Sequence, residues 1–217
     1  MRSPVEKPAI LRREGALWAL AKPAGLAAHP TGDPSVPDVI GWAVAHGAPE
    51  GLAPVHRLDR DTSGVLLASH DPVLRASLGA LFAEGAVRKR YLALVAGRAH
   101  AKGIVRRPLA DARRGRPLPA VTRYRRLAIF GRVSLLEVRP ETGRRHQIRR
   151  HLAGIGLPIV GDARYGPRRF APVAGFPGRL WLHAASLELP DGRVFEAPLP
   201  RELADHLALL EERFGRR

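Results

Sequence analysis

The sequence predicts an α+β fold built on a mixed, mostly antiparallel sheet that is flanked by helices. Two observations predict it: long strand patterns are mixed with four helical patterns, and most of these segments are joined by short turns. A third observation concerns size, since 217 residues with 45% hydrophobic content suit one large globular domain or two small ones sharing a core. Because no repeat or convincing boundary appears, we expect a single catalytic domain over residues 1–217, with its core at about 17–200.

The first half of the chain shows two strands and two helices. Residues 17–21 are predicted to form the first strand, with about sixteen residues before it, and a turn closes it at 22–25. Asp38 is positioned to cap a short helix, and residues 65–69 read as a buried strand. A clear helix follows, because Asp71 suits its N-cap, Pro72 its first turn and Gly85 its end.

The second half carries more strand patterns. A strand is predicted at 87–95, and two more at 121–130 and 132–139 with Gly131 near their turn. The basic, proline-bearing stretch 99–119, with Arg106, Arg107, Arg113, Arg114 and Arg116, reads as a long excursion or flexible loop. The remaining predicted segments are a helix at 144–155, a hairpin at 180–197 and a last helix from Pro200 to about Gly215.

Charge is the strongest compositional signal. The formal net charge is +16, and four of the 36 basic residues are lysine, which leaves 32 arginines against 20 acidic residues. Arginine forks onto phosphates and stacks on bases, so this composition favours a nucleic-acid partner. A GC-rich genome would explain arginine over lysine, but it explains the shortage of acidic residues less easily.

Several classes are disfavoured. The chain has no cysteine, which excludes disulfides and thiolate metal sites, and no apolar run approaches a membrane span. Phosphate-loop, dinucleotide-binding and zinc-protease patterns are missing, and His146 and His151 are five residues apart, a poor spacing for metal ligands on a helix. We therefore expect a cytoplasmic monomer with no metal site and no membrane contact.

The stretch from Val55 to Leu67, VHRLDRDTSGVLL, is the first of three candidate site segments. It places the Asp59 carboxylate between Arg57 and Arg60, just before a turn-prone run that leads into a buried strand. A carboxylate held among arginines on such a loop stays ionised and can act as a nucleophile or base. The alternative is a structural ion pair beside a tight turn.

The other two segments pair cations with an aromatic ring or a helix start. Lys89-Arg90-Tyr91 lies on a predicted strand, where the tyrosine either belongs to the core or stacks on a base. In ETGRRHQIRRH, residues 141–151, four arginines at a helix start form either a solvated face or a phosphate clamp. Arg149 falls near the apolar stripe of that helix, so its guanidinium needs a carboxylate partner, for which Asp59 is the candidate.

Taken in order, these segments resemble the signature of the RluA-type pseudouridine synthases. HRLDRDTSGVLL resembles the catalytic motif of that family, KRYLALVAG its tyrosine strand, and TGRRHQIRRHLAGIGLPIVGDARYG its third motif, while LWLHAASLEL matches a late strand. The resemblance runs from about Leu17 to about Pro200. It implies the pseudouridine synthase fold with a central active-site cleft, and an isomerase that converts uridine in RNA to pseudouridine without metal or organic cofactor.

The resemblance also implies roles for residues. Asp59 matches the essential carboxylate, Arg149 the basic residue that pairs with it, and Tyr91 the tyrosine that packs against the target base. Arg57 matches a residue that fills the gap left by the flipped-out uridine. The remaining residues expected to contact RNA are Arg60, Lys89, Arg144, Arg145, His146 and Gln147.

The target RNA stays open at this point. Many relatives carry an N-terminal S4-like RNA-binding domain, which we do not expect here. LPAVTRYRRL and GRRHQIRRHL are closest to the branch acting on tRNA, although enzymes of ribosomal RNA share most of these residues. The competing functions are a non-catalytic RNA-binding or assembly factor on the same fold, and a glycosylase that releases the base.

Overall fold

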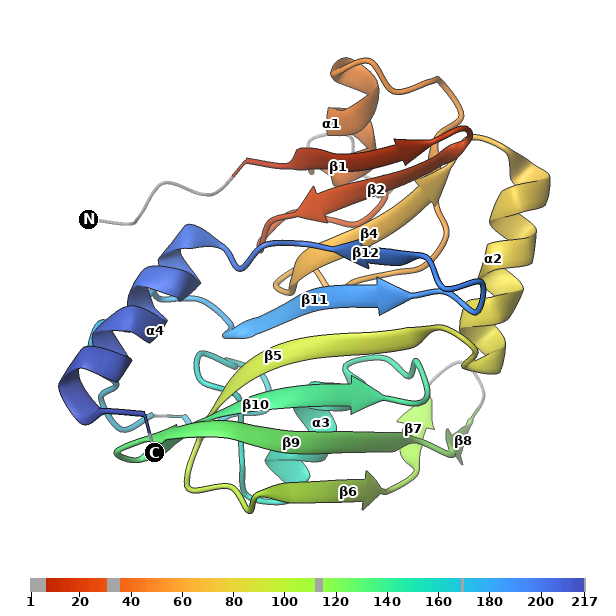
Figure 1. The fold of residues 1–217 in the computed structure, drawn as a ribbon. Helices are drawn as coiled ribbons and strands as arrows, with labels where there is room; N and C mark the ends of the chain where they lie inside the picture. Colours follow the sequence, from red (N-terminus) through yellow and green to blue (C-terminus); the bar gives the residue numbers. More distant parts are fainter. Residues whose placement is uncertain (1–6, 31–35, 112–114, 169, 217) are drawn as a thin grey trace. The chain divides into compact units, whose positions relative to one another are not determined.

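The computed structural model describes residues 7–30, 36–111, 115–168 and 170–216. The chain divides into two compact units, each with its own hydrophobic core. Figure 1 shows the strands and helices that belong to each unit. We call Pro4–Arg88 with Ala184–Pro198 the N-terminal unit, and Lys89–His183 with Leu199–Arg217 the C-terminal unit. The expectation of a single catalytic domain stays a prediction.

The N-terminal unit is built on antiparallel strands. β1 (Ala9–Glu14), β2 (Leu17–Lys22) and β4 (Ser63–Ser69) follow one another, and short β3 (Ala53–Pro54) also pairs with β4. β11 (Leu182–Glu188) comes next to β4 in the strand order and forms the predicted hairpin with β12 (Val194–Glu196). β4 is buried along its whole length, which fits its unbroken apolar sequence.

Both helices of this unit begin where the sequence predicts, and α2 also ends there. α1 (Val39–Ala45) starts at Asp38, whose carboxylate accepts from the backbone N–H groups of Ile40 and Gly41. α2 (Pro72–Glu84) starts at Asp71, which caps Val73 and Leu74 in the same way, and it ends at Gly85 in the left-handed conformation.

The C-terminal unit contains the longer strands. β5 (Arg88–Ala96), β10 (Val133–Pro140), β9 (Val121–Phe130) and β6 (Lys102–Arg106) follow one another with antiparallel pairing throughout. A small separate hairpin joins β7 (Leu109–Asp111) to β8 (Arg116–Leu118). The predicted α+β class with a mostly antiparallel sheet is confirmed.

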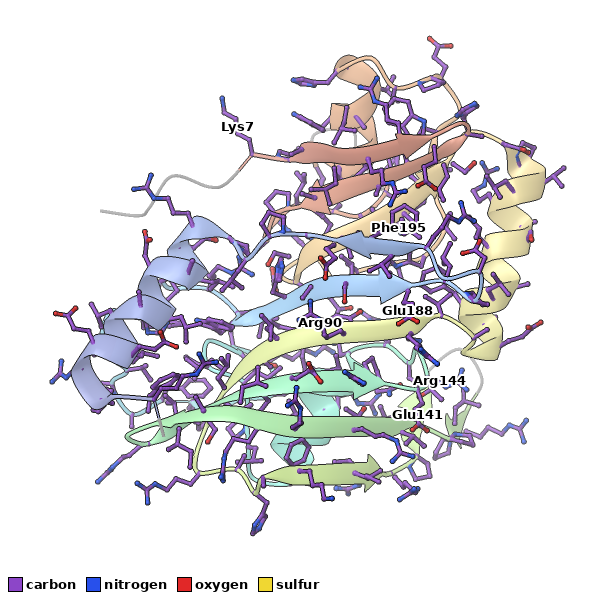
Figure 2. All side chains as sticks on the ribbon, in the orientation of Figure 1. Lys7, Arg90, Glu141, Arg144, Glu188 and Phe195 are labelled. Carbon is purple, nitrogen blue, oxygen red and sulfur yellow. The ribbon has the colours of Figure 1, made fainter. Side chains whose placement is uncertain are left out.

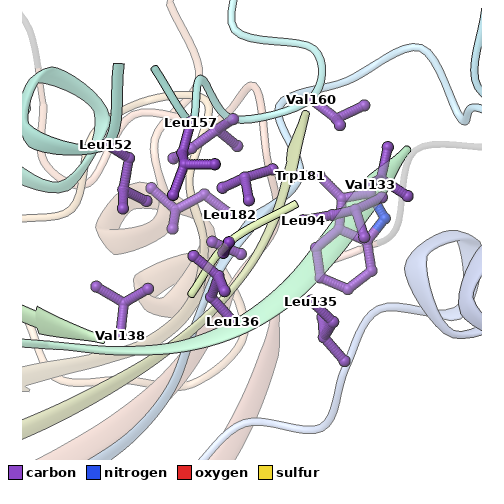
Figure 3. Close-up of a cluster of buried hydrophobic side chains, with 14 of the residues drawn as sticks. Leu94, Val133, Leu135, Leu136, Val138, Leu152, Leu157, Val160, Trp181 and Leu182 are labelled. Atoms are coloured by element: carbon purple, nitrogen blue, oxygen red, sulfur yellow. The ribbon is translucent and has the colours of Figure 1, made fainter. Parts of the chain in front are cut away.

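Leucine, valine and tryptophan side chains form the core of the C-terminal unit (Figure 3). Leu94, Leu136 and Val138 from the sheet pack with Leu152 of α3 (Gln147–Gly154) and with Trp181. α4 (Arg201–Phe214) adds Leu203 and Leu210 to the same cluster. The final helix was therefore predicted correctly.

Three predicted boundaries were wrong. The stretch 99–119 is not one loop, because β6 pairs with β9 and β7 pairs with β8; Arg113 and Arg114 lie outside the described residues. β1 precedes the predicted first strand, and its charged, half-exposed side chains gave no burial signal. α3 begins at Gln147 and not at Arg144, because His146 takes up a left-handed conformation (φ 53°) at its N-cap.

Gly64, in the motif around Asp59, is fixed by a close backbone approach. Its φ is +134°, and a Cβ placed there would lie 2.2 Å from the carbonyl oxygen of Ala184 in β11. Any other residue would have to push β4 and β11 apart, so the glycine is required by packing as well as by conformation.

We therefore expect Gly64→Ala to lower the free energy of unfolding by about 3 kcal/mol or more, through overpacking and backbone strain. Chemical denaturation measures this. Gly192→Ala is the control, since Gly192 also has a positive φ (+87°) but has open space around its Cβ position. Its cost should be about 1 kcal/mol. Equal losses in the two variants would show that the close approach to Ala184 is unimportant.

Candidate active site

The loop that carries Asp59 is held at its start by backbone and histidine contacts. The N–H of Val55 donates to the carbonyl of Leu67 at 2.8 Å, and the N–H of Leu67 donates to Nε2 of His56 at 3.0 Å. The His56 ring stacks on Phe82 of α2, with ring centroids 4.3 Å apart. His56 is thus the residue that joins the motif to the core strand and to α2.

The side chain of Lys22 also anchors this loop. Its side chain is 1% exposed, and its ammonium group donates to the carbonyls of Pro23, Leu26 and Arg60 at 2.8–2.9 Å. The N–H of Gly25 also donates to the Arg60 carbonyl, and Nε of Arg60 donates to the Gly25 carbonyl, each at 2.9 Å. The backbone beside Asp59 is therefore locked to the turn that follows β2.

Asp59 itself is half-buried at the start of a turn. Its carbonyl accepts from the N–H of Thr62 at 3.1 Å, and Arg57 and Arg60 on either side are exposed. The hydroxyl of Thr62 is buried, and among the described residues it has no hydrogen-bond partner. A buried polar group without a partner costs about 1–3 kcal/mol, which is typical of a site that receives a ligand.

Tyr91 and Lys89 share one side of β5. Tyr91 pairs in register with Val138 and packs against the core of the C-terminal unit. The sequence offered two roles for this tyrosine, a core residue or a platform on which a base stacks, and its position is compatible with both. Lys89 lies two residues earlier on the same side of the strand. Burial lowers the pKa of its amine below the usual 10.5. Arg90 points to the other side of the sheet (Figure 2).

Arg149 has a buried carboxylate partner that the sequence analysis did not name. The guanidinium is 6% exposed, and its Nε and Nη2 donate to the two carboxylate oxygens of Asp162 at 2.8 Å each. The guanidinium also lies over the ring of Tyr165, 5.2 Å from its centroid. The prediction that this arginine needs a carboxylate is confirmed, and Asp162 supplies it.

Asp162 organises the turn from 162 to 166 around this pair. Its Oδ1 also accepts from the N–H groups of Arg164 and Tyr165, each at 3.0 Å. Burial alone would raise the pKa of the carboxyl, but the hydrogen bonds and charge of Arg149, with those two amides, outweigh it. The net effect lowers the pKa below its ordinary 3.8.

The segment before α3 is anchored by Gln147, which is buried. Its amide nitrogen donates to the Val121 carbonyl and to the Thr122 hydroxyl, and its amide oxygen accepts from the N–H of Arg144 and the hydroxyl of Thr142. Because these four bonds use the capacity of the amide, Gln147 holds Arg144 in place from inside the protein.

The neighbours of Gln147 differ in exposure. Arg144 and Arg145 are exposed, and Nε of Arg144 donates to the Pro119 carbonyl at 3.1 Å. Nδ1 of half-buried His146 lies 2.9 Å from the hydroxyl of Tyr165, next to the Arg149–Asp162 pair. Figure 2 shows Glu141 and Arg144 near the C-terminal end of β10, in the segment between β10 and α3.

The predicted site residues therefore fall in both units. Asp59, Arg57 and Arg60 belong to the N-terminal unit, whereas Tyr91, Lys89, Arg149 and residues 144–147 belong to the C-terminal unit. The pairing of Asp59 with Arg149 stays a prediction. In the part of the chain that the structure describes, no group of three or more His, Asp or Glu side chains forms a metal site, and no helix could cross a bilayer.

The family model for RNA pseudouridylate synthase matches residues 16–154. An uncharacterized RNA pseudouridine synthase of Chloroflexus aurantiacus is 42% identical over 88% of this chain and 66% of its own length. Ribosomal large subunit pseudouridine synthase D of Nitrosomonas europaea is 35% identical over 90% and 63%. tRNA pseudouridine synthase C of Salmonella typhimurium is 36% identical over 83% and 79%.

A solved structure shows the same fold. Human RNA Pseudouridylate Synthase Domain Containing 4 superimposes with a TM-score of 0.78 at 25% identity, covering 93% of this chain and 92% of that one. The protein has the pseudouridine synthase fold. The chain belongs to the RNA pseudouridylate synthase family, of the RluA type that its motifs resemble. It spans about two thirds of the length of the Chloroflexus and Nitrosomonas relatives.

Lys22→Met should destabilise the N-terminal unit by about 2–4 kcal/mol, because three carbonyls, one of them buried and two partly buried, lose a charged donor. Denaturant unfolding of the purified protein measures the change. Lys7→Met is the control, because Lys7 is exposed and its loss should change stability by less than about 0.5 kcal/mol. Matching stabilities for Lys22→Met and the unmodified protein would contradict the anchoring role.

Asp162→Asn should cost about 3–5 kcal/mol at neutral pH, because Arg149 stays buried without a charged partner. The carboxyl has a lowered pKa in the folded state, so its contribution is full above the unfolded value near 3.8 and is lost as the pH falls through the folded value. Unfolding curves at several pH values should therefore converge for the two proteins in acid. Asp205→Asn, on exposed α4, should show neither effect.

Proposed function

We propose that this protein is an RNA pseudouridine synthase, an isomerase that converts a specific uridine of a structured RNA to pseudouridine. The observation that carries the proposal is the family match over residues 16–154, which includes Asp59, Tyr91 and Arg149. The net charge of +16 fits a polyanionic substrate. A cytoplasmic location belongs to the same proposal.

The reaction demands one poised carboxylate. The glycosidic bond between N1 and C1′ breaks, the base turns, a bond forms between C5 and C1′, and the proton on C5 moves to N1. Because the product is an isomer of the substrate, no oxidant, reductant or co-substrate is consumed. We assign the essential step to Asp59, which either adds covalently to the base or the sugar, or takes a sugar proton.

The anchored loop suits this role. Lys22 and the reciprocal bonds between Gly25 and Arg60 fix the backbone on one side of Asp59, and His56 fixes it on the other. Catalytic groups gain their effect from being held in place before the substrate arrives.

Tyr91 and Arg149 are proposed to complete the site. Tyr91 would pack against the target base, and Arg149 would pair with Asp59 and keep it ionised. Arg149 is already oriented by Asp162 and Tyr165, so a second carboxylate would meet a guanidinium with little freedom left to lose.

RNA contacts are proposed for the cations beside these groups, of which Arg57, Arg60, Arg144 and Arg145 are exposed. Arg57 would fill the gap left in the RNA stack when the uridine is turned out, which costs a few kcal/mol of unstacking. Arg60, Lys89, Arg144, Arg145 and His146 would contact the RNA. For Gln147, whose amide is engaged inside the protein, we propose an indirect role through the position of Arg144.

The target is either transfer RNA or ribosomal RNA. Relatives named for each class align with this chain at nearly equal identity, 36% for the Salmonella enzyme and 35% for the Nitrosomonas enzyme. These identities do not separate the two branches. Mapping pseudouridines in total RNA with and without the gene would identify the substrate.

Asp59→Asn should abolish pseudouridine formation and leave RNA affinity within about threefold, because the amide keeps the shape of the side chain but cannot act as nucleophile or base. Turnover is measured by mass spectrometry of digested RNA, and affinity by filter binding. Asp61→Asn is the matched control, since Asp61 is an exposed carboxylate in the same loop.

Two further readouts separate the competing functions. Free uracil detected by chromatography would indicate a glycosylase in place of an isomerase. Full rescue of a deletion strain by the Asp59→Asn protein would indicate an RNA-binding or assembly factor whose chemistry is dispensable. Normal pseudouridine formation by the Asp59→Asn protein would overturn the mechanism.

A further inference from the structure

One face of the sheet in the C-terminal unit carries a row of cations across all four strands. Tyr91 is in register with Val138, Val138 with Tyr124, and Tyr124 with Gly103, so these residues share the face toward α3. Residues one position away on each strand point to the opposite face. We call the cations there the arginine face: Arg90, Lys102, Arg106, Arg123, Arg125 and Arg139.

The contacts of β9 with α3 identify the two faces of this sheet. Thr122 lies two residues from Tyr124 on β9. Its hydroxyl accepts a hydrogen bond from Gln147 and is hydrogen-bonded to His151, and both of these residues belong to α3. The Tyr91 side of the sheet is therefore covered by α3. Arg123 and Arg125 alternate with Thr122 and Tyr124 along β9 and so project away from α3.

Like charges lie directly opposite one another on the arginine face. Arg123 of β9 is the register partner of Arg139 of β10, and Arg125 of β9 is the register partner of Lys102 of edge strand β6. Directly opposed like charges destabilise a sheet pair by a few tenths of a kcal/mol or more. A sheet face with two such pairs is unfavourable for folding by itself.

The acidic residues on this face neutralise only part of its charge. Glu141 pairs with Arg123, and Glu137 is shared by Arg139 at 3.0 Å and Arg125 at 3.5 Å. Among the described residues of β6, β9 and β10 and the residue after β10, five cations of this face therefore stand against two carboxylates. The side chains of Arg123, Arg125 and Arg139 keep 49%, 64% and 63% of their surface exposed, so their guanidinium groups remain accessible to a ligand.

The alternative is an ordinary solvated face held by surface ion pairs. α4 and the residues just after it provide an example of such a solvated face. Arg201 pairs with Asp205 one turn away, and Arg216 lies 3.8 Å from Glu211. Each of these two arginines has its own acidic partner. On the arginine face a single carboxylate serves two arginines, and cations are placed opposite cations, so the positive charge is concentrated there.

We propose that the arginine face is a second RNA-binding surface, which takes the phosphate backbone of a double-helical arm of the substrate RNA. This rests on the proposed function, because that function supplies the RNA. Tyr91 lies on the opposite side of the same sheet, and β6 is the edge strand between the two sides. An RNA arm that passes this edge would contact cations without occupying the uridine site.

The test removes three cations from the face and compares their loss with an equal loss elsewhere. The face variant carries Lys102→Gln, Arg106→Gln and Arg123→Gln, which leaves the ion pairs of buried Glu137 intact. The control carries Arg201→Gln, Arg213→Gln and Arg216→Gln on and after α4. Both variants lower the formal net charge by three, from +16 to +13.

RNA affinity is measured at several salt concentrations with a tRNA transcript and with a 20-base-pair RNA duplex as probes. Each lost duplex phosphate contact should reduce the slope of log K against log salt by about 0.9, so the face variant should lose about 2.7. At 0.1 M salt that slope corresponds to an affinity loss on the order of 100-fold or more. The α4 control should keep both slope and affinity.

Thermal unfolding checks that the face variant is folded. Since it removes both opposed cation pairs, its melting temperature at low salt should equal or exceed that of the unmodified protein. If the triple variant unfolds, Lys102→Gln with Arg106→Gln alone on β6 should still reduce the slope by about 1.8. Equal slope changes in the face and control variants, or none in the face variant, would overturn the proposal.

Binding and chemistry are read separately, so the two proposals fail separately. A reduced slope in the face variant, with no pseudouridine formed by the unmodified protein on any RNA, would support the arginine face and overturn the proposed reaction. Pseudouridine formation that requires Asp59, together with an unchanged slope in the face variant, would support the reaction and overturn the second surface.

Discussion

The buried ion pair between Arg149 and Asp162 is the interaction on which the C-terminal half of the site depends. Two parallel bonds of 2.8 Å in a position with almost no solvent join α3 to the turn at 162–166, and the same carboxylate caps that turn. A buried pair of this kind gains little net stability over an apolar one, but the loss of either partner is costly. Its value here is orientation: the guanidinium is held by Asp162 on its edge and by Tyr165 on its face. A catalytic carboxylate that approached it would meet a charge that is already desolvated and fixed.

The use of lysine in this arginine-rich chain follows the same logic. The chain has four lysines, and two of them, Lys22 and Lys89, are buried. Lys22 donates to three carbonyls from two separate segments, which suits the three donors of a compact ammonium better than a planar guanidinium. Arginine, in contrast, is found where a planar fork is needed, as on Asp162, or where charge faces solvent. Scarcity alone does not mark such an anchor in the sequence, because the other two lysines, Lys7 and Lys102, are exposed.

The parts of the fold and the site that could be predicted are those written in local sequence. Asp71, Pro72 and Gly85 define α2 through capping chemistry, and the apolar run after Gly64 defines β4. The need of Arg149 for a carboxylate followed from its place beside an apolar stripe, but its partner Asp162 is thirteen residues away across a loop, so helix periodicity could not reveal it. β1 and β6 were missed because edge strands with charged side chains show no burial pattern. α3 starts later than predicted because His146 adopts a left-handed conformation. A histidine in the sequence gives no indication of that conformation.

The cations of this protein fall into two sets with opposite surroundings, one buried and one facing solvent. The cations that position groups (Lys22, Arg149) are buried, and their charges are absorbed by carbonyls or a carboxylate, so they add little to the long-range field. The cations that face solvent on the sheet carry the excess of positive charge, and salt screens them. RNA attraction should therefore depend strongly on ionic strength, whereas the geometry around Asp59 and Arg149 should not. If the proposed function is right, this separation would let the protein bind RNA without disturbing the ion pair between Arg149 and Asp162, because the two sets of charges act in media of very different dielectric response.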